Sequence, residues 1–415
     1  MNPFEEKPMP IDKTFENWEK LYPCSYLKSE VDPYTKTRII LMNGTEFEAN
    51  WFSHQFSRHC NNNDLRRDLA ITRRVEKQQQ MKIQNLKPIN ENILETTISY
   101  EQLAVDLTAR LAQNEPNVNV RNALNFALLE DFDHLYRYSN LLEMEYRVLP
   151  EKLVGRYTEI MPGRPTISHH RAPNDSIREY ITKDSDLITK LNVNIITAAE
   201  QQTMNYYMNI GGFYTSDLGR KLYQEIGMVE EEHVSQYESL MDPNQTWLER
   251  LLMHEYTECY LYYSCFEDEC DPYIKKIWET YFQYEITHLH LACELLKKYE
   301  NKEWQQVIPD GRFPKLLNLG PNIEYVRNVL KNTVNLTAIC ENYINVNDLP
   351  KDACFFKYQE IVNDNPCKVP SHMVIDKYIS RNCMDYRFEV AQNPIPELRN
   401  RMCDNICVGR QPLCK

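Results

Sequence analysis

The chain has 415 residues, and 42% of them are hydrophobic, so it is long enough for two or three domains with a sizeable core. A net charge of -13 disfavours non-specific binding to nucleic acid or to anionic membranes, and we expect neither as a partner. The 13 cysteines, in a sequence with no recognisable export signal, favour reduced thiols and a cytoplasmic protein. Only 10 glycines beside 27 tyrosines, with long apolar-periodic runs, predict an all-α fold.

Three regions follow one another along the chain. Residues 1–95 are polar and are expected to be an N-terminal extension, in which Asn43-Gly44 between two short apolar runs indicates a small hairpin. Residues 96–300 are strongly helix-periodic and are expected to form the central helical bundle. Residues 301–415 begin with a loop that bears proline and glycine, and they are expected to be a cysteine-rich, mainly helical C-terminal region.

One spacing recurs three times in the central region. An acidic residue is followed thirty residues later by a carboxylate-x-x-His motif, and a turn signal lies near the midpoint. The three sets are Glu101 with Asp131 and His134, Glu200 with Glu230 and His233, and Glu255 with Glu285 and His288. Two antiparallel helices, each about twelve or thirteen residues long from the turn, would bring the upstream acid and the motif to the same height.

These acids and histidines interrupt the apolar stripes of their helices instead of lying opposite them. The helix around residues 219–240, for example, has Leu222, Ile226, Tyr237 and Leu240 on the same face as its motif. Buried carboxylates are costly unless they are paired or bind a cation, and several at one level would repel each other. We therefore interpret the residues as metal ligands, against the simpler reading of three hairpins with ionic pairs at partly solvated interfaces.

The pattern of Glu followed by carboxylate-x-x-His, repeated in a second hairpin, resembles the ferritin-like di-iron carboxylate proteins, and rubrerythrins in particular, over about residues 96–300. The resemblance implies a ferritin-like antiparallel helical bundle, here with three helical hairpins instead of two. It also implies a centre of two iron ions, or manganese, that reacts with peroxide or dioxygen. Because the paired Cys-x-x-Cys motifs of a rubredoxin module are absent, an external electron donor would be required.

Which two of the three hairpins form the site is left open. The 66 residues between His134 and Glu200 suffice for the long crossover of this family, whereas the 22 between His233 and Glu255 are too few. Ligand chemistry instead favours the second and third hairpins, because the first has Asp131 where the others have glutamate. The surplus hairpin could add ligands, cap the site or carry a second metal centre.

The leading hypothesis is a di-metal carboxylate oxidoreductase that acts on peroxide or dioxygen, and hydroxylation of an organic substrate is the other enzymatic interpretation. Non-catalytic metal binding or storage, or a structural helical protein, is the alternative. No residue is assigned a catalytic role, and a homo-oligomer is left open. In the C-terminal region a zinc or iron–sulfur site competes with reduced structural thiols as the role of Cys367, Cys383, Cys403, Cys407 and Cys414.

Overall fold

The computed structural model describes residues 1–155, 157–164, 171–172, 175–365 and 368–383. Most of these residues are helical, which confirms the predicted all-α class. The chain forms two compact units, and each unit is assembled from separate stretches of sequence. Unit 1 comprises Met1–Asn90, Tyr180–Gln202 and Met241–Leu319, and unit 2 comprises Glu91–Glu179, Thr203–Leu240 and Gly320–Lys415.

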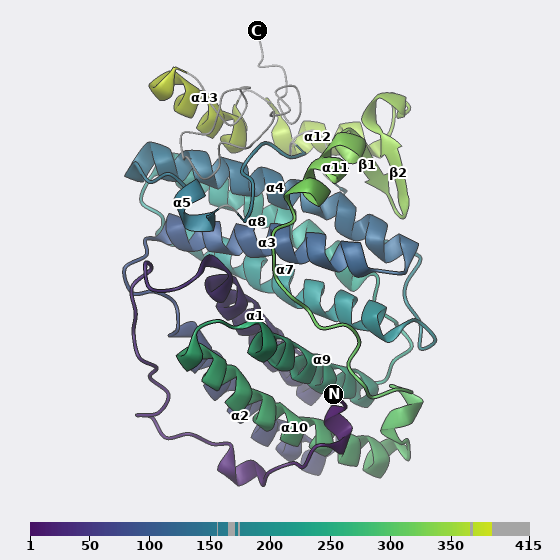
Figure 1. Cartoon of the computed structure of the whole chain (residues 1–415). Helices are drawn as coiled ribbons and strands as arrows, with labels where there is room; N and C mark the ends of the chain where they lie inside the picture. The colour runs from purple at the N-terminus through teal and green to yellow at the C-terminus, as the bar shows by residue number, and fades with distance from the viewer. Residues whose placement is uncertain (156, 165–170, 173–174, 366–367, 384–415) are drawn as a thin grey trace. The chain divides into compact units, whose positions relative to one another are not determined.

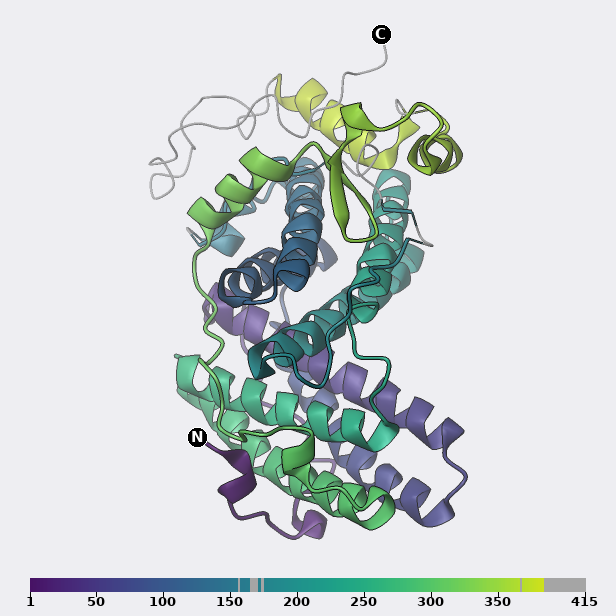
Figure 2. The same cartoon turned by 90° about the vertical axis from the view of Figure 1, so that its right-hand side faces the viewer.

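Unit 1 is built on four long helices that lie side by side (Figures 1 and 2). They are α1 (Pro33–His59), α2 (Asn63–Gln84), α9 (Trp247–Asp268) and α10 (Pro272–Glu300). Helix α1 packs on α2 and α9, while α10 packs on α9 and α2, so the four helices share one interior. Three short 3-10 helices contact α10 from outside: η1 (Pro3–Glu5), η2 (Ile11–Lys13) and η3 (Trp304–Gln306).

The helix boundaries in this unit follow local capping chemistry. Thr246 and Glu249 form a reciprocal capping box at the start of α9. The Asp271 side chain accepts hydrogen bonds from the first turn of α10, and Pro272 occupies the first helical position. The expected turn between these two helices is therefore confirmed.

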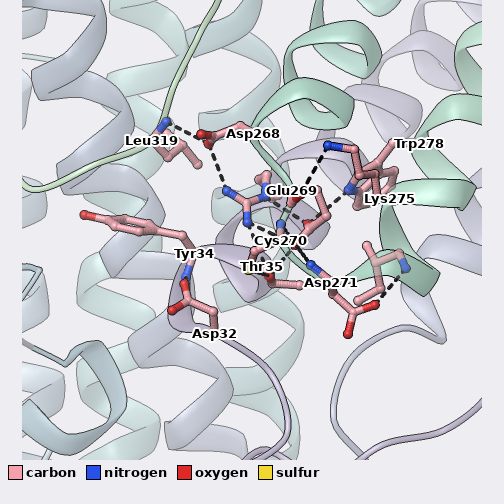
Figure 3. Close-up of polar contacts among 12 residues, drawn as sticks. Asp32, Tyr34, Thr35, Asp268, Glu269, Cys270, Asp271, Lys275, Trp278 and Leu319 are labelled. Carbon is pink, nitrogen blue, oxygen red and sulfur yellow. Dashed lines mark hydrogen bonds and ion pairs between the residues drawn. The ribbon is translucent and has the colours of Figure 1, made fainter.

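A buried polar network ties the start of α1 to the turn between α9 and α10. Thr35 and Trp278 both point toward the carboxylate of Glu269 (Figure 3), and their hydrogen bonds to it measure 2.6 and 3.2 Å. Arg38 donates to the two oxygens of Glu269 at 3.0 and 3.1 Å, and to Asp268 at 2.9 Å. The bidentate geometry fixes the register of α1 against α9.

The predicted hairpin at Asn43-Gly44 is wrong, because both residues lie inside α1 and are buried. A Cβ atom on Gly44 would stand 2.7 Å from the side-chain nitrogen of Gln202. That side chain accepts a hydrogen bond from Asn43 and donates one to the carbonyl of Ile40 at 3.0 Å. Glycine thus permits a close helix contact here and does not mark a turn.

Unit 2 also contains long helices: α3 (Ile93–Asn114), α4 (Val118–Tyr146), α8 (Asp217–Glu238) and the Thr203–Phe213 part of α7 (Leu187–Phe213). Helix α4 packs on α3 and α8, and Gly211 on α7 and Gly227 on α8 lie where these two helices face each other. The turn signals expected after α3 and after α7 are confirmed, since Asn117 and Ser216 cap the helices that follow them.

The C-terminal region contributes smaller elements to unit 2. They are α11 (Ile323–Thr333), the antiparallel strands β1 (Leu336–Ile339) and β2 (Asn342–Asn345), η4 (Val346–Asp348), α12 (Cys354–Asn363) and α13 (Pro370–Asn382). Helix α13 packs on α4 and α8, α11 packs on α4, and the short α5 (Glu151–Val154) packs on α3. We did not predict these two strands, because the region is expected from its sequence to be mainly helical.

The predicted domain boundaries differ from the two units. Helices α9 and α10 of the expected 96–300 bundle belong to unit 1, where they pack with α1 and α2 from the expected N-terminal extension. The reason lies in α1, whose residues from Tyr34 to Glu46 are all buried, so its sequence lacks the one-sided apolar stripe that identifies a helix.

Candidate metal centres

Five of the predicted ligands meet in the interior of unit 2. This unit 2 cluster consists of Glu101 on α3, Asp131 and His134 on α4, and Glu230 and His233 on α8. Each of these residues is at most 1% exposed. Ligand atoms of Glu101, His134 and Glu230 lie within 4.8 Å of one another, and so do those of Asp131, Glu230 and His233.

Glu230 stands between the two imidazoles of the unit 2 cluster. Its Oε1 lies 3.0 Å from Nδ1 of His134, and its Oε2 lies 3.3 Å from Nδ1 of His233. Burial opposes its ionisation, but the hydrogen bonds of the two imidazoles outweigh burial and hold the pKa of Glu230 below its usual range. An ionised carboxylate with one oxygen toward each imidazole is suited to bridge two cations.

A carboxylate that the sequence analysis did not select orients His233. Glu130 Oε2 lies 2.9 Å from Nε2 of this histidine, which leaves Nδ1 facing Asp131 at 3.2 Å. Such a partner on the far nitrogen is the usual way to set the orientation of a metal-binding imidazole. Burial raises the pKa of Asp131, and the contact with His233 only partly offsets that effect.

Tyr207 on α7 lies beside the unit 2 cluster and donates a 2.5 Å hydrogen bond to Oε1 of Glu101. Its ring packs against Tyr138 and Tyr223, with centroids 5.3 and 5.8 Å away. These tyrosines are fully buried, and burial raises the pKa of each phenol well above its usual range. The cluster is therefore bordered by neutral aromatic side chains.

The third predicted set, Glu255, Glu285 and His288, gathers in unit 1. Nδ1 of His288 lies 3.0 Å from Glu285 and 3.8 Å from Glu255. The other members of this unit 1 cluster are Glu46 on α1, Glu76 and Gln79 on α2, and Glu258 on α9. The sequence analysis missed Glu46, Glu76 and Gln79, whereas Glu258, one turn after Glu255, is an alternative to that residue on the sequence alone. Ligand atoms of Glu76, Glu255 and His288 lie within 4.8 Å of one another, as do those of Glu255, Glu258 and Glu285.

The carboxylates of unit 1 are crowded in a buried space. Burial, reinforced by repulsion between neighbouring carboxylates, raises the pKa values of Glu46, Glu255 and Glu258 well above the usual range. Burial also raises the pKa of Glu76 to about 7. These groups cannot all be ionised together unless a cation compensates their charge.

Several buried ligand atoms have no hydrogen-bond partner among the described residues. In unit 2 they include Oδ2 of Asp131 and Nε2 of His134, and in unit 1 both oxygens of Glu258 and Nε2 of His288. Buried polar atoms are normally satisfied, and a cation would satisfy these. Both clusters have the residues and the geometry to hold a metal ion.

Glu200 is 1% exposed and lies on α7, in the part of this helix that belongs to unit 1, and it stays a candidate ligand. Cys367, Cys403, Cys407 and Cys414 lie outside the described residues, while Cys383 is exposed at the end of α13. The zinc or iron–sulfur site therefore also stays a prediction.

Comparison with known proteins found no family model, curated protein or solved structure that matches the chain. The fold and the clusters described above characterise the protein as an all-α chain with two buried carboxylate–imidazole clusters among its described residues. Among the described helices, none combines the length and the apolar character that a membrane crossing needs.

Proposed function

We propose that the protein is a di-metal carboxylate oxidoreductase that acts on peroxide or dioxygen, with its reaction centre in the unit 2 cluster. The proposal rests on Glu230. This residue contacts His134 with one carboxylate oxygen and His233 with the other, and it belongs to the groups of ligand atoms around both histidines. Mixed carboxylate and imidazole ligands suit iron and manganese. Glu200 is a further candidate ligand because it is buried and precedes Glu230 by thirty residues.

Two redox-active ions bound here would supply the two electrons that, with two protons, reduce hydrogen peroxide to two water molecules, and an external donor would return these electrons. The side chains have separate tasks in this scheme. Glu230 would hold metal on the sides of both His134 and His233. Glu130 contacts Nε2 of His233 and so keeps Nδ1 of this histidine directed at Glu230. Asp131, which faces Nδ1 of His233 at 3.2 Å, would hold metal beside that histidine.

The tyrosines beside the cluster would control its surroundings. Tyr207 fixes the orientation of the Glu101 carboxylate through its hydrogen bond. The packed rings of Tyr138, Tyr207 and Tyr223 exclude water from that side, which strengthens the electrostatic interactions of the buried carboxylates.

The test is a single-turnover reaction of the ferrous protein. Metal-free full-length protein is loaded with Fe2+ without oxygen and mixed with hydrogen peroxide, and the near-ultraviolet absorbance of ferric carboxylate is followed. We expect a rapid phase that consumes one peroxide for about two ferrous ions. Glu230→Ala should abolish this phase, whereas Glu231→Ala, a change at the neighbouring and partly exposed position, should retain it.

Two results would contradict the proposal. Iron that binds but reacts with peroxide no faster than free Fe2+ would favour metal binding or storage without catalysis. An unchanged rapid phase in Glu230→Ala would show that the reaction does not depend on this cluster.

A further inference from the structure

Helices α1 and α2 carry the same spacing as the three hairpins found from the sequence. Glu46 on α1 precedes Glu76 on α2 by thirty residues, and Gln79 occupies the position at which the other hairpins have histidine. The described part of the chain therefore contains four hairpins of one design. Unit 1 combines the first with the fourth, α9–α10.

The contacts inside the two units agree with this correspondence. Tyr262, seven residues after Glu255, donates a hydrogen bond to Glu46, just as Tyr207 donates one to Glu101 in unit 2. Nε2 of Gln79 lies 2.6 Å from Oε1 of Glu285. In unit 2 the equivalent distance, from Nδ1 of His134 to Oε1 of Glu230, is 3.0 Å. Gln79 thus takes the place of His134 in space as well as in sequence.

One further exchange compensates for the missing imidazole. Glu258 lies three residues after Glu255, at the position that Thr203 occupies relative to Glu200. Unit 1 therefore offers five carboxylates and one imidazole: Glu46, Glu76, Glu255, Glu258, Glu285 and His288. Carboxylate oxygens are hard ligands that suit Mn2+, Mg2+ and Ca2+, whereas imidazole suits iron, zinc and copper.

The unit 1 cluster also shows independent signs that it binds a cation. Both oxygens of Glu258, Oε2 of Glu255 and Nε2 of His288 are buried without a hydrogen-bond partner among the described residues. Two basic residues of α2 are engaged elsewhere, since Arg73 donates to Ser53 and Lys77 donates to Gln80. No hydrogen bond from either residue to the cluster is found within the described part of the chain.

We infer that unit 1 holds a second metal centre, distinct from that of unit 2, for two hard divalent cations such as Mn2+. Glu255 belongs to both groups of ligand atoms, one with Glu76 and His288 and the other with Glu258 and Glu285, which is the position of a bridging ligand. This centre goes beyond the proposed function, because the unit 2 reaction does not require it.

The test uses Mn2+ alone with the full-length, metal-stripped chain. Glu230→Ala/His233→Ala removes two ligands of the unit 2 cluster, and bound Mn2+ is counted by the loss of the six-line electron paramagnetic resonance signal of the free ion. We expect about two Mn2+ per chain in this background. Adding Glu258→Gln, a change that preserves side-chain size, should weaken binding at least tenfold. Glu267→Gln, at an exposed position of the same helix, should not.

Circular dichroism of each variant confirms that the helices are intact, and the rise in melting temperature on adding Mn2+ gives a second measure of binding. No Mn2+ in the folded background protein, or equal binding with and without Glu258, would overturn the inference. The rapid reaction of the ferrous native protein with peroxide reports on the unit 2 cluster and is measured separately. Failure of the Mn2+ test in unit 1 can therefore be distinguished from failure of the proposed function in unit 2.

The composition of the cluster is tested by exchanging its two distinctive residues for those of unit 2. Gln79→His/Glu258→Thr, in the same background, should lower the preference for Mn2+ over Co2+ at least tenfold, and Gln79→His alone should shift it in the same direction. The visible absorbance of Co2+ reports its coordination. An unchanged preference in both variants would refute the assignment of a hard-cation centre.

Discussion

Replacing Glu76 by glutamine should stabilise the metal-free protein and weaken metal binding at the same time. Burial raises the pKa of Glu76 from 4.5 to about 7; the nearby His288 opposes this shift, and Glu285 adds to it more weakly. Below pH 4.5 the carboxyl is protonated in the folded and unfolded chain alike, so its pKa shift costs nothing. As the pH rises, the unfolded chain loses this proton first, and above pH 7 the folded state is destabilised by up to about 3 kcal/mol.

Glutamine carries no charge, so the variant should escape this loss. At pH 8 its free energy of unfolding should exceed that of the native sequence by up to about 3 kcal/mol, and the two should converge near pH 4.5. A unit of this size gains about 2–4 °C in melting temperature per kcal/mol. Thermal unfolding in chelator, followed by circular dichroism from pH 4.5 to 8, measures the difference, with Glu267→Gln as the exposed control.

Saturating metal should reduce this difference in stability between the two proteins. Mn2+ at one hundred times its Kd stabilises a single-site protein by about 2.7 kcal/mol, and the Glu76→Gln protein should gain less because it lacks one ligand. If the metal-free variant is no more stable than the native sequence at pH 8, burial does not raise the pKa of Glu76 and the reasoning is refuted.

Three further substitutions test individual contacts. Arg38→Ala should cost about 3–5 kcal/mol in chemical denaturation, because it leaves Glu269 buried without its cation; a loss below 1 kcal/mol would contradict this. Gly44→Ala should cost about 1–3 kcal/mol in the same assay, since the new Cβ displaces Gln202, and a more stable protein would show that the helices can separate freely. Tyr207→Phe should lower the melting temperature by the equivalent of about 1–3 kcal/mol and retain bound metal by elemental analysis, whereas loss of the metal would make the phenol essential to the centre.

The sequence predicts the ligand sets where a charged residue interrupts an apolar stripe. Asp131, His134, Glu230 and His233 were selected on that ground, and the structure brings them together in unit 2. Glu130 was not selected, although it contacts His233, because it immediately precedes Asp131 and spacing along one helix cannot show which neighbour faces the partner helix. The difference between two adjacent acids depends on packing between helices.

The first hairpin was missed for a chemical reason. Its acids follow the thirty-residue rule, but Gln79 stands where the search required histidine, and glutamine is a weak metal ligand. The first helix of this hairpin is also buried along most of its length, so its sequence does not divide into an apolar and a polar face. Glu46 therefore does not stand out as a charged residue on an apolar face. The spacing of Glu46 and Glu76 is the one signal of this hairpin that the sequence carries.

Helix geometry determines where the ligands of the two clusters lie, whereas individual side chains determine the charge of each ligand set. The thirty-residue spacing places an acid and a motif at one height in every hairpin, so any two such hairpins that pack together create a buried set of ligands. Gln79 and Glu258 then replace one imidazole by one carboxylate in unit 1, which makes the ligand set more anionic. A more anionic ligand set favours harder cations. The same four-helix design can therefore hold different metal ions in the two units, and the exchange at positions 79 and 258 is the direct test of that conclusion.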